Sequence, residues 1–169
     1  MRRRQLLRRR IPYVLEGNDV RLLGVDFGDV RIGLAVSDPT GTIARPLRTI
    51  TPHGSLDEYA AIVVREVGTL MTEVDGLDAV VVGVPRSLDG TVHQQTTRTL
   101  AFIDSLRKAT PLPVLVQDER LSSIEAEQRL AIREQDWRKR KKLLDAASAA
   151  VILQDYLDEH RSQGFDVED

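Results

Sequence analysis

Carboxylates at three separate places in this sequence are the side chains best suited to chemistry. Asp26 lies at the end of one apolar run, and Asp118 and Glu119 end another. Asp145 lies near the start of the helix expected at the C-terminus. Two or more carboxylates without histidine or cysteine favour a hard cation, Mg²⁺ or Mn²⁺. Such sites commonly act on phosphates, and a pair of ions about 4 Å apart can support phosphodiester cleavage.

Each of these acids also has an ordinary structural explanation. Asp26 could do no more than shape the turn at Gly28. The Asp-Glu-Arg sequence at 118–120 could form a surface ion pair that contributes little. Asp145 could cap the final helix. It also falls at helical spacing with core candidates of that helix, namely Ala149, Ile152 and Tyr156. A charged residue among the packing residues of a helix needs an explanation. A helix cap and a functional role together with the other acids therefore both stay open for Asp145.

Five apolar runs predict the strands that position most of these acids. They cover residues 22–27, 32–36, 43–50, 79–84 and 114–117. The first two flank Gly28 and are typical of a hairpin. Pro46 restricts the third to a sheet edge or a bulge. The fourth is a β-branched run, which is typical of a buried parallel strand.

Helical periodicity and helix breakers predict the remaining elements. The predicted helices cover about 56–74, 93–108, 122–134 and 143–160. A capping box is expected at the first of them, because Ser55 is followed three residues later by Glu58. Small residues at 146–150 would let the last helix lie close to the sheet.

This order of elements predicts an α/β fold, with a mixed sheet of about five strands flanked by helices. Three strands are antiparallel, and two parallel strands follow. The carboxyl ends of the first, fourth and fifth strands then share one edge, where open α/β sheets bind ligands. Asp26 and Glu119 would lie two strand spacings apart, about 10 Å at the backbone. That gap favours the longer Glu119 over Asp118 as the partner of Asp26.

Composition limits the class of protein. A chain of 169 residues with 41% hydrophobic residues suits one globular domain with its own core. The lack of cysteine excludes disulfides, thiol catalysis and thiolate zinc sites. No apolar run approaches the length of a membrane span. We expect a cytoplasmic protein with no membrane partner, made of a flexible basic arm over 1–20, a domain over 21–160 and an acidic tail over 161–169.

Charge is segregated along the chain, although the formal net charge is only -2. Arginines are concentrated between Arg2 and Arg10, and residues 138–142 are all basic. Basic runs are often only solvated surface, but those beside the acids are placed to hold phosphates. The candidates for nucleic-acid contact are Arg31, Arg86, Arg120, Lys141 and Lys142. Because aromatic residues are few, we expect recognition of phosphates and shape rather than base stacking.

Four segments of the chain together resemble the motifs of the YqgF/RuvX family. They are GVDFGDVRIGLAVSD, VVGVPRSLDGT, QDERLSSIEAE and KKLLDAASAAVILQDYL, and they span about Leu22 to Leu157. Each motif alone is weak, but four in this order and spacing are specific. The resemblance implies an RNase H-like fold related to the RuvC Holliday-junction resolvases. The chain departs from the family's pattern in its arginine-rich arm and at Ser122 and Ser123, where a threonine is frequent.

The resemblance also implies a metal-dependent nuclease, a hydrolase that acts on phosphodiester bonds. Its catalytic and metal-binding residues would be Asp26, Glu119 and Asp145, with Mg²⁺ or Mn²⁺ as cofactor. The implied substrate is the 5′ end of pre-16S ribosomal RNA in ribosome biogenesis, or alternatively a four-way DNA junction. The protein would act as a monomer or homodimer.

Two other classes of function remain as alternatives. The first is a non-catalytic module that only binds nucleic acid, against which the intact acidic triad argues. The second is the sugar-kinase and actin-like ATPase fold, whose phosphate loop also resembles the VDFG segment. That fold needs a second, similar lobe, for which this chain has no room.

Overall fold

A central sheet and three helices make up the described part of the chain. The structure, a computed structural model, describes residues 20–86, 94–119 and 137–162. The strands are β1 (Leu22–Phe27), β2 (Ile32–Ser37), β3 (Ala44–Ile50), β4 (Ala79–Pro85) and β5 (Val114–Glu119). The helices are α1 (Leu56–Thr72), α2 (Gln94–Ala109) and α4 (Trp137–Ser162). No helix within these ranges is long and apolar enough to cross a membrane.

The strands form one sheet in the order β3-β2-β1-β4-β5. β2 runs antiparallel to both β1 and β3, whereas β4 runs parallel to both β1 and β5. The predicted RNase H-like α/β sheet, with three antiparallel strands followed by two parallel ones, is therefore confirmed. β3 is an edge strand, and its pairing with β2 shifts register between Leu34 and Ala35, the partner of Pro46. Both features agree with the restriction expected from that proline.

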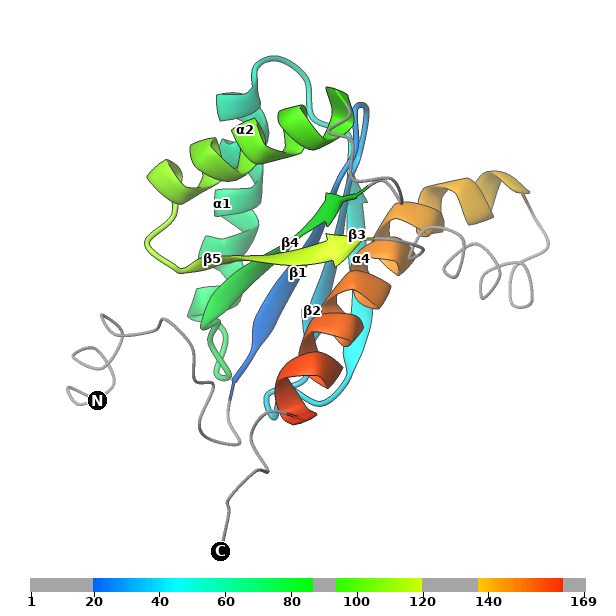
Figure 1. Cartoon of the computed structure of the whole chain (residues 1–169). Helices are drawn as coiled ribbons and strands as arrows, with labels where there is room; N and C mark the ends of the chain where they lie inside the picture. Colours follow the sequence, from blue (N-terminus) through cyan, green and yellow to red (C-terminus); the bar gives the residue numbers. More distant parts are fainter. Residues whose placement is uncertain (1–19, 87–93, 120–136, 163–169) are drawn as a thin grey trace, which may run out of the picture.

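Buried apolar side chains fill both sides of the sheet. Helices α1 and α2 cover one face and α4 covers the other (Figure 1). On the first face, the rings of Phe27 and Phe102 are stacked 4.3 Å apart. On the second face, Ile152 and Leu153 of α4 are fully buried against the strands. Because β1, β2 and β4 are covered on both faces, their sequences are apolar at nearly every position.

The described helices match their predicted counterparts except at the start of the last. Ser55 and Glu58 form the predicted capping box at the start of α1. Helix α4 already includes Trp137, whereas its predicted start was near Leu143. The basic run between these residues interrupts the apolar periodicity, but lysine and arginine are good helix formers and continue the helix. The helix predicted over 122–134 lies outside the described residues, as do most of the predicted arm and tail.

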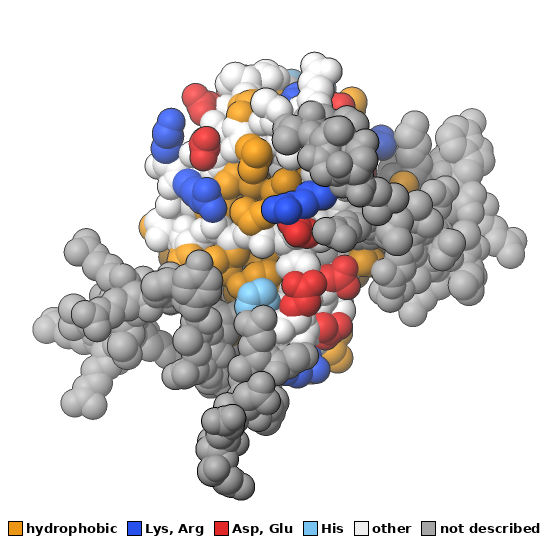
Figure 2. All heavy atoms as spheres, in the orientation of Figure 1, with side chains coloured by type: hydrophobic (Ala, Val, Ile, Leu, Met, Phe, Trp, Pro, Cys, Tyr) orange, Lys and Arg blue, Asp and Glu red, His pale blue; other side chains and the backbone are white. Residues whose placement is uncertain are grey.

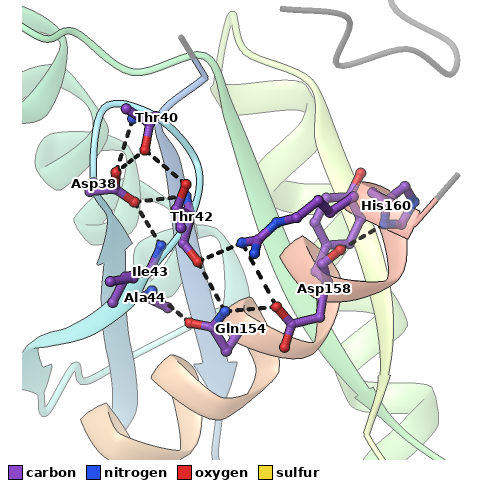
Figure 3. Close-up of polar contacts among 10 residues, drawn as sticks. Asp38, Thr40, Thr42, Ile43, Ala44, Gln154, Asp158 and His160 are labelled. Atoms are coloured by element: carbon purple, nitrogen blue, oxygen red, sulfur yellow. Dashed lines mark hydrogen bonds and ion pairs between the residues drawn. The ribbon is translucent and has the colours of Figure 1, made fainter. Parts of the chain in front are cut away.

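A hydrogen-bond network ties the β2–β3 connection to the C-terminal half of α4 (Figure 3). The carboxylate of Asp38 accepts bonds from one hydroxyl and three backbone N–H groups, which belong to Thr40, Thr42 and Ile43. Burial acts in the opposite direction, but these bonds lower the pKa of Asp38 to about 2. Gln154 of α4 accepts a bond from Ala44 N–H and donates one to the Thr42 carbonyl. The network therefore anchors the C-terminal half of α4 at the end of the sheet where β1 begins, opposite to the carboxyl end of β1.

Candidate active site at the carboxyl edge of the sheet

Asp26 lies near the carboxyl end of β1, before the turn that leads into β2. That turn is closed by a hydrogen bond of 2.9 Å from Gly28 N–H to the Arg31 carbonyl, and Asp26 itself belongs to the strand. Burial raises the pKa of Asp26 well above its ordinary value, and the nearby charges of Glu119 and Asp145 raise it further. The three acids predicted to act together are therefore close enough to interact, which a turn-shaping role for Asp26 does not explain.

Glycines flank Asp26 on both neighbouring strands. Gly33 of β2 is its direct partner, and a Cβ atom at Gly33 would overlap the backbone carbonyl of Asp145. The missing side chain lets α4 lie against β2 and brings Asp145 to the sheet edge. On the other side, Val25 pairs with Val82 of β4, and Gly83 is the next residue of that strand.

Glu119 is the last residue of β5 and reaches back across β4. Its Oε2 atom lies 3.2 Å from the position that a Cβ of Gly83 would take. Because Gly83 has no side chain, the long side chain of Glu119 can cross β4 toward Asp26. Asp118 points to the opposite face, as strand alternation requires, and it forms an ion pair of 2.8 Å with Arg86. Of the two adjacent acids, Glu119 is the one whose charge acts on Asp26.

Asp145 lies within α4, about two turns after Trp137. The interpretation of Asp145 as a helix cap is therefore wrong. Its Oδ2 accepts a hydrogen bond of 2.6 Å from Nε of Arg31, and the two side chains form an ion pair. Arg31, expected to contact a phosphate, thus contacts an acid in the structure. Over the described ranges, no three side chains of the metal-binding types already converge closely enough to hold an ion.

The other basic residues expected to contact nucleic acid are described only in part. Arg86 is exposed at this edge, beside Asp118. Lys141 and Lys142 belong to α4, and Arg120 lies outside the described residues. Figure 2, in the orientation of Figure 1, shows Lys and Arg side chains together with some acidic ones around an apolar patch in the upper half of the molecule, and a further group of acidic side chains below it. The charge on the described part of this side is therefore mixed.

A recess beside the turn after β1 was not predicted. It has a volume of about 310 Å³ and is lined by Asp29, Gln94, Gln95 and Arg98. Arg98 pairs with Asp29 at 3.0 Å and lies 5.6 Å from the centre of the Phe27 ring. Gln95 donates a hydrogen bond to the Phe27 carbonyl. The polar residues at the start of α2 carry no motif, so the sequence offered no signal for this recess.

Comparison with known proteins agrees with the four motifs. A family model described as RuvX, Holliday junction resolvase, matches residues 20–159. A relative from Thermoanaerobacter pseudethanolicus, named "Putative pre-16S rRNA nuclease", is 34% identical over 146 residues, which cover 85% of this chain and 100% of the relative. A relative of the same name from Desulforamulus reducens is 37% identical over 142 residues, which cover 82% of this chain and 97% of the relative.

Among solved structures, RuvC of T. thermophilus in complex with Holliday junction substrate is similar over 86% of this chain and 96% of that chain. The TM-score is 0.48 and the sequence identity is 15%. The family match and the sequence relatives, each covering most of the chain, decide the assignment. This chain belongs to the RuvX family.

Proposed function

We propose that this protein is a metal-dependent endonuclease that hydrolyses phosphodiester bonds in structured RNA, with the 5′ end of pre-16S rRNA as its substrate. One observation carries the proposal: the fold gathers carboxylates from separate parts of the chain, because Gly33, the strand partner of Asp26, lies against the Asp145 carbonyl, and the Glu119 carboxylate lies beside Gly83. Such a cluster holds its full negative charge readily only with a cation beside it. The name of the sequence relatives supports the RNA substrate. Processing of rRNA would place the protein in the cytoplasm.

The chemistry of the donor set fits Mg²⁺ or Mn²⁺. Asp26 and Asp145 would bind the ion, and Glu119 would be a third ligand or would orient the attacking water. All three residues offer carboxylate oxygens, which hard cations prefer, and the sequence has no cysteine that would favour a softer metal. A bound ion would stabilise the negative charge that develops on the phosphate and the leaving oxygen.

Basic side chains around the cluster would hold the substrate's phosphates. The candidates are Arg86, Arg120, Lys141 and Lys142, and Arg98 in the recess after β1 adds a further one. Phosphate contacts of this kind position a nucleic acid without reading its bases. Attack of water on the phosphorus atom would leave a 5′-phosphate and a 3′-hydroxyl, as expected of an RNase H-like nuclease.

The substrate can be tested by comparing two labelled nucleic acids in one assay. One is a pre-16S rRNA fragment that spans the 5′ processing site, and the other is a synthetic four-way DNA junction. With Mg²⁺ we expect cleavage of the RNA and not of the junction. A chelator should abolish the reaction, since the charge of the ion would then be missing.

A second candidate function is resolution of Holliday junctions, because the matching family model carries that description. Symmetric cleavage of the junction without cleavage of the RNA would favour this function over rRNA processing. A resolvase would also be expected to act as a two-fold dimer, since it cuts two strands. Binding of either nucleic acid without any cleavage would instead favour a non-catalytic module.

A further inference from the structure

Arg31 holds one of the three acids in a way that the sequence did not indicate. It is the last residue of the turn between β1 and β2, directly before Ile32 at the start of β2. Its Nε donates to Oδ2 of Asp145 at 2.6 Å. The side chain of Arg31 is 33% exposed and that of Asp145 is 24% exposed, so the ion pair lies at the border between the interior and the solvent.

We propose that Arg31 is an internal counter-ion of the acid cluster, which occupies Asp145 while no metal is bound and competes with a divalent cation for that carboxylate. This proposal rests on the proposed function, because it assumes that Asp145 is a metal ligand. Its consequence is that Arg31 stabilises the metal-free protein and weakens metal binding.

The contact has the features of a pair that can open. Only one nitrogen of the guanidinium, Nε, is bonded to Asp145, whereas the strongest arginine–carboxylate pairs use two parallel bonds. A third of the Arg31 side chain is already exposed, so its charged end can move into water at little cost in solvation. The long stem of an arginine gives the freedom for this movement.

The position of Asp145 does not depend on Arg31. Its backbone carbonyl lies directly against Gly33, and the helix continues into fully buried residues at Ala149 and Ile152. Loss of Arg31 would therefore leave Asp145 in place, but the negative charge of its carboxylate would no longer be offset. The packing of α4 therefore determines where the backbone of Asp145 lies, whereas Arg31 offsets the charge of its carboxylate.

Electrostatics gives the direction of the effect. Without metal, the positive charge of Arg31 offsets the negative charge of Asp145, which α4 holds against Gly33, the strand partner of Asp26. With metal, the same charge repels a divalent ion a few ångströms away. Removing the charge should therefore destabilise the metal-free protein and tighten metal binding.

The test uses calorimetric titration of the full-length protein with Mn²⁺ at neutral pH. We expect Arg31→Gln to bind Mn²⁺ about 3- to 10-fold more tightly than the wild type, a difference of about 0.7–1.4 kcal/mol. Arg31→Lys, which keeps the charge, should stay within about twofold of the wild type. Arg48→Gln is the matched control, because Arg48 pairs with Glu66 at 3.2 Å on the face of the sheet covered by α1.

Thermal unfolding with and without Mn²⁺ supplies a second readout. Arg31→Gln should unfold at a lower temperature than the wild type without metal, and Mn²⁺ should raise its unfolding temperature by a larger amount. In the wild type, NMR should show faster solvent exchange of the Arg31 Nε–H when Mg²⁺ is saturating. This last measurement does not require that Arg31→Gln folds.

Unchanged or weaker Mn²⁺ binding by folded Arg31→Gln would overturn the counter-ion role, as would an Nε–H that stays protected at saturating Mg²⁺. These results would leave the proposed function standing if the wild type binds Mn²⁺. A wild-type protein that binds no Mn²⁺ would overturn the metal-dependent function and this proposal together.

Discussion

Asp26 is an acid placed where ionisation is unfavourable. Burial is the largest cause of its raised pKa, and Glu119 and Asp145 add to it. A raised pKa means that the folded, metal-free protein holds a proton that the unfolded chain releases. The stability of the metal-free protein is therefore expected to fall as the pH rises from about 4 toward the raised pKa.

Asp26→Asn is expected to stabilise the metal-free protein at pH 8 relative to the wild type. The amide carries no charge, so we expect a gain of about 1 kcal/mol or more in the free energy of unfolding, and a much smaller gain at pH 4. Urea unfolding in the presence of EDTA measures both values. Asp104→Asn, at an exposed position of α2, is the control. A wild type as stable as Asp26→Asn at pH 8 would contradict the unfavourable ionisation.

Asp38 shows the opposite behaviour, because hydrogen bonds lower its pKa to about 2. Its contribution to stability is present above about pH 4 and is lost as the pH falls toward 2. Asp38→Ala should therefore cost about 1 kcal/mol at pH 7, a small value because solvent screens the side chain. The difference from the wild type should shrink at pH 2.5. An equal difference at both pH values would contradict a role of the charged carboxylate.

Among the elements, α4 determines whether the site forms. It carries Asp145, and it approaches the sheet most closely where its backbone lies against Gly33. At its other end, Gln154 donates a hydrogen bond to the Thr42 carbonyl (Figure 3), and Arg161 donates another to the same carbonyl. The helix is thus fixed at both ends of β2, near Gly33 and near Thr42. A displacement at Gly33 would move Asp145 relative to Asp26.

Gly33→Ala should therefore disrupt the site as well as the packing. The added Cβ overlaps the Asp145 carbonyl, so we expect a loss of about 1–3 kcal/mol in stability and at least about 100-fold in cleavage rate. Gly68→Ala is the matched control, because that position in α1 has open space. It should gain roughly 0.5–1 kcal/mol and keep its activity. Full activity of Gly33→Ala would contradict the positioning role of this contact.

Most elements could be predicted because local patterns determine them. The apolar runs of β1 and β4 and the pair Ser55 and Glu58 each specify a strand or a helix start from adjacent residues. The start of α4 could not be predicted from periodicity, because a basic run forms helix without an apolar stripe. Glycines within apolar strands are a known sign of close backbone approach. Gly33 and Gly83 are such glycines. The sequence alone does not show which residues lie against them, because that depends on the strand register.

At the scale of the whole molecule, the site is a product of topology. Asp26, Glu119 and Asp145 come from parts of the chain separated by tens of residues. They interact because β1 and β5 run parallel on either side of β4, and because α4 crosses the same face of the sheet (Figure 1). Strand order predicted that Asp26 and Glu119 would share one edge of the sheet, whereas the triad with Asp145 was implied by the resemblance to the YqgF/RuvX family. The Arg31–Asp145 pair could not be predicted, since it depends on side-chain positions across the sheet and α4.

The most direct test of the central claim is single-turnover cleavage of the pre-16S rRNA fragment in Mg²⁺ by the wild type and by Asp26→Asn, Glu119→Gln and Asp145→Asn. We predict that the wild type cleaves and that each variant, although folded, is slower by at least about 1,000-fold, because a ligand or the water-orienting group is lost. Cleavage by all three variants at the wild-type rate would contradict the assignment of these carboxylates as the active site.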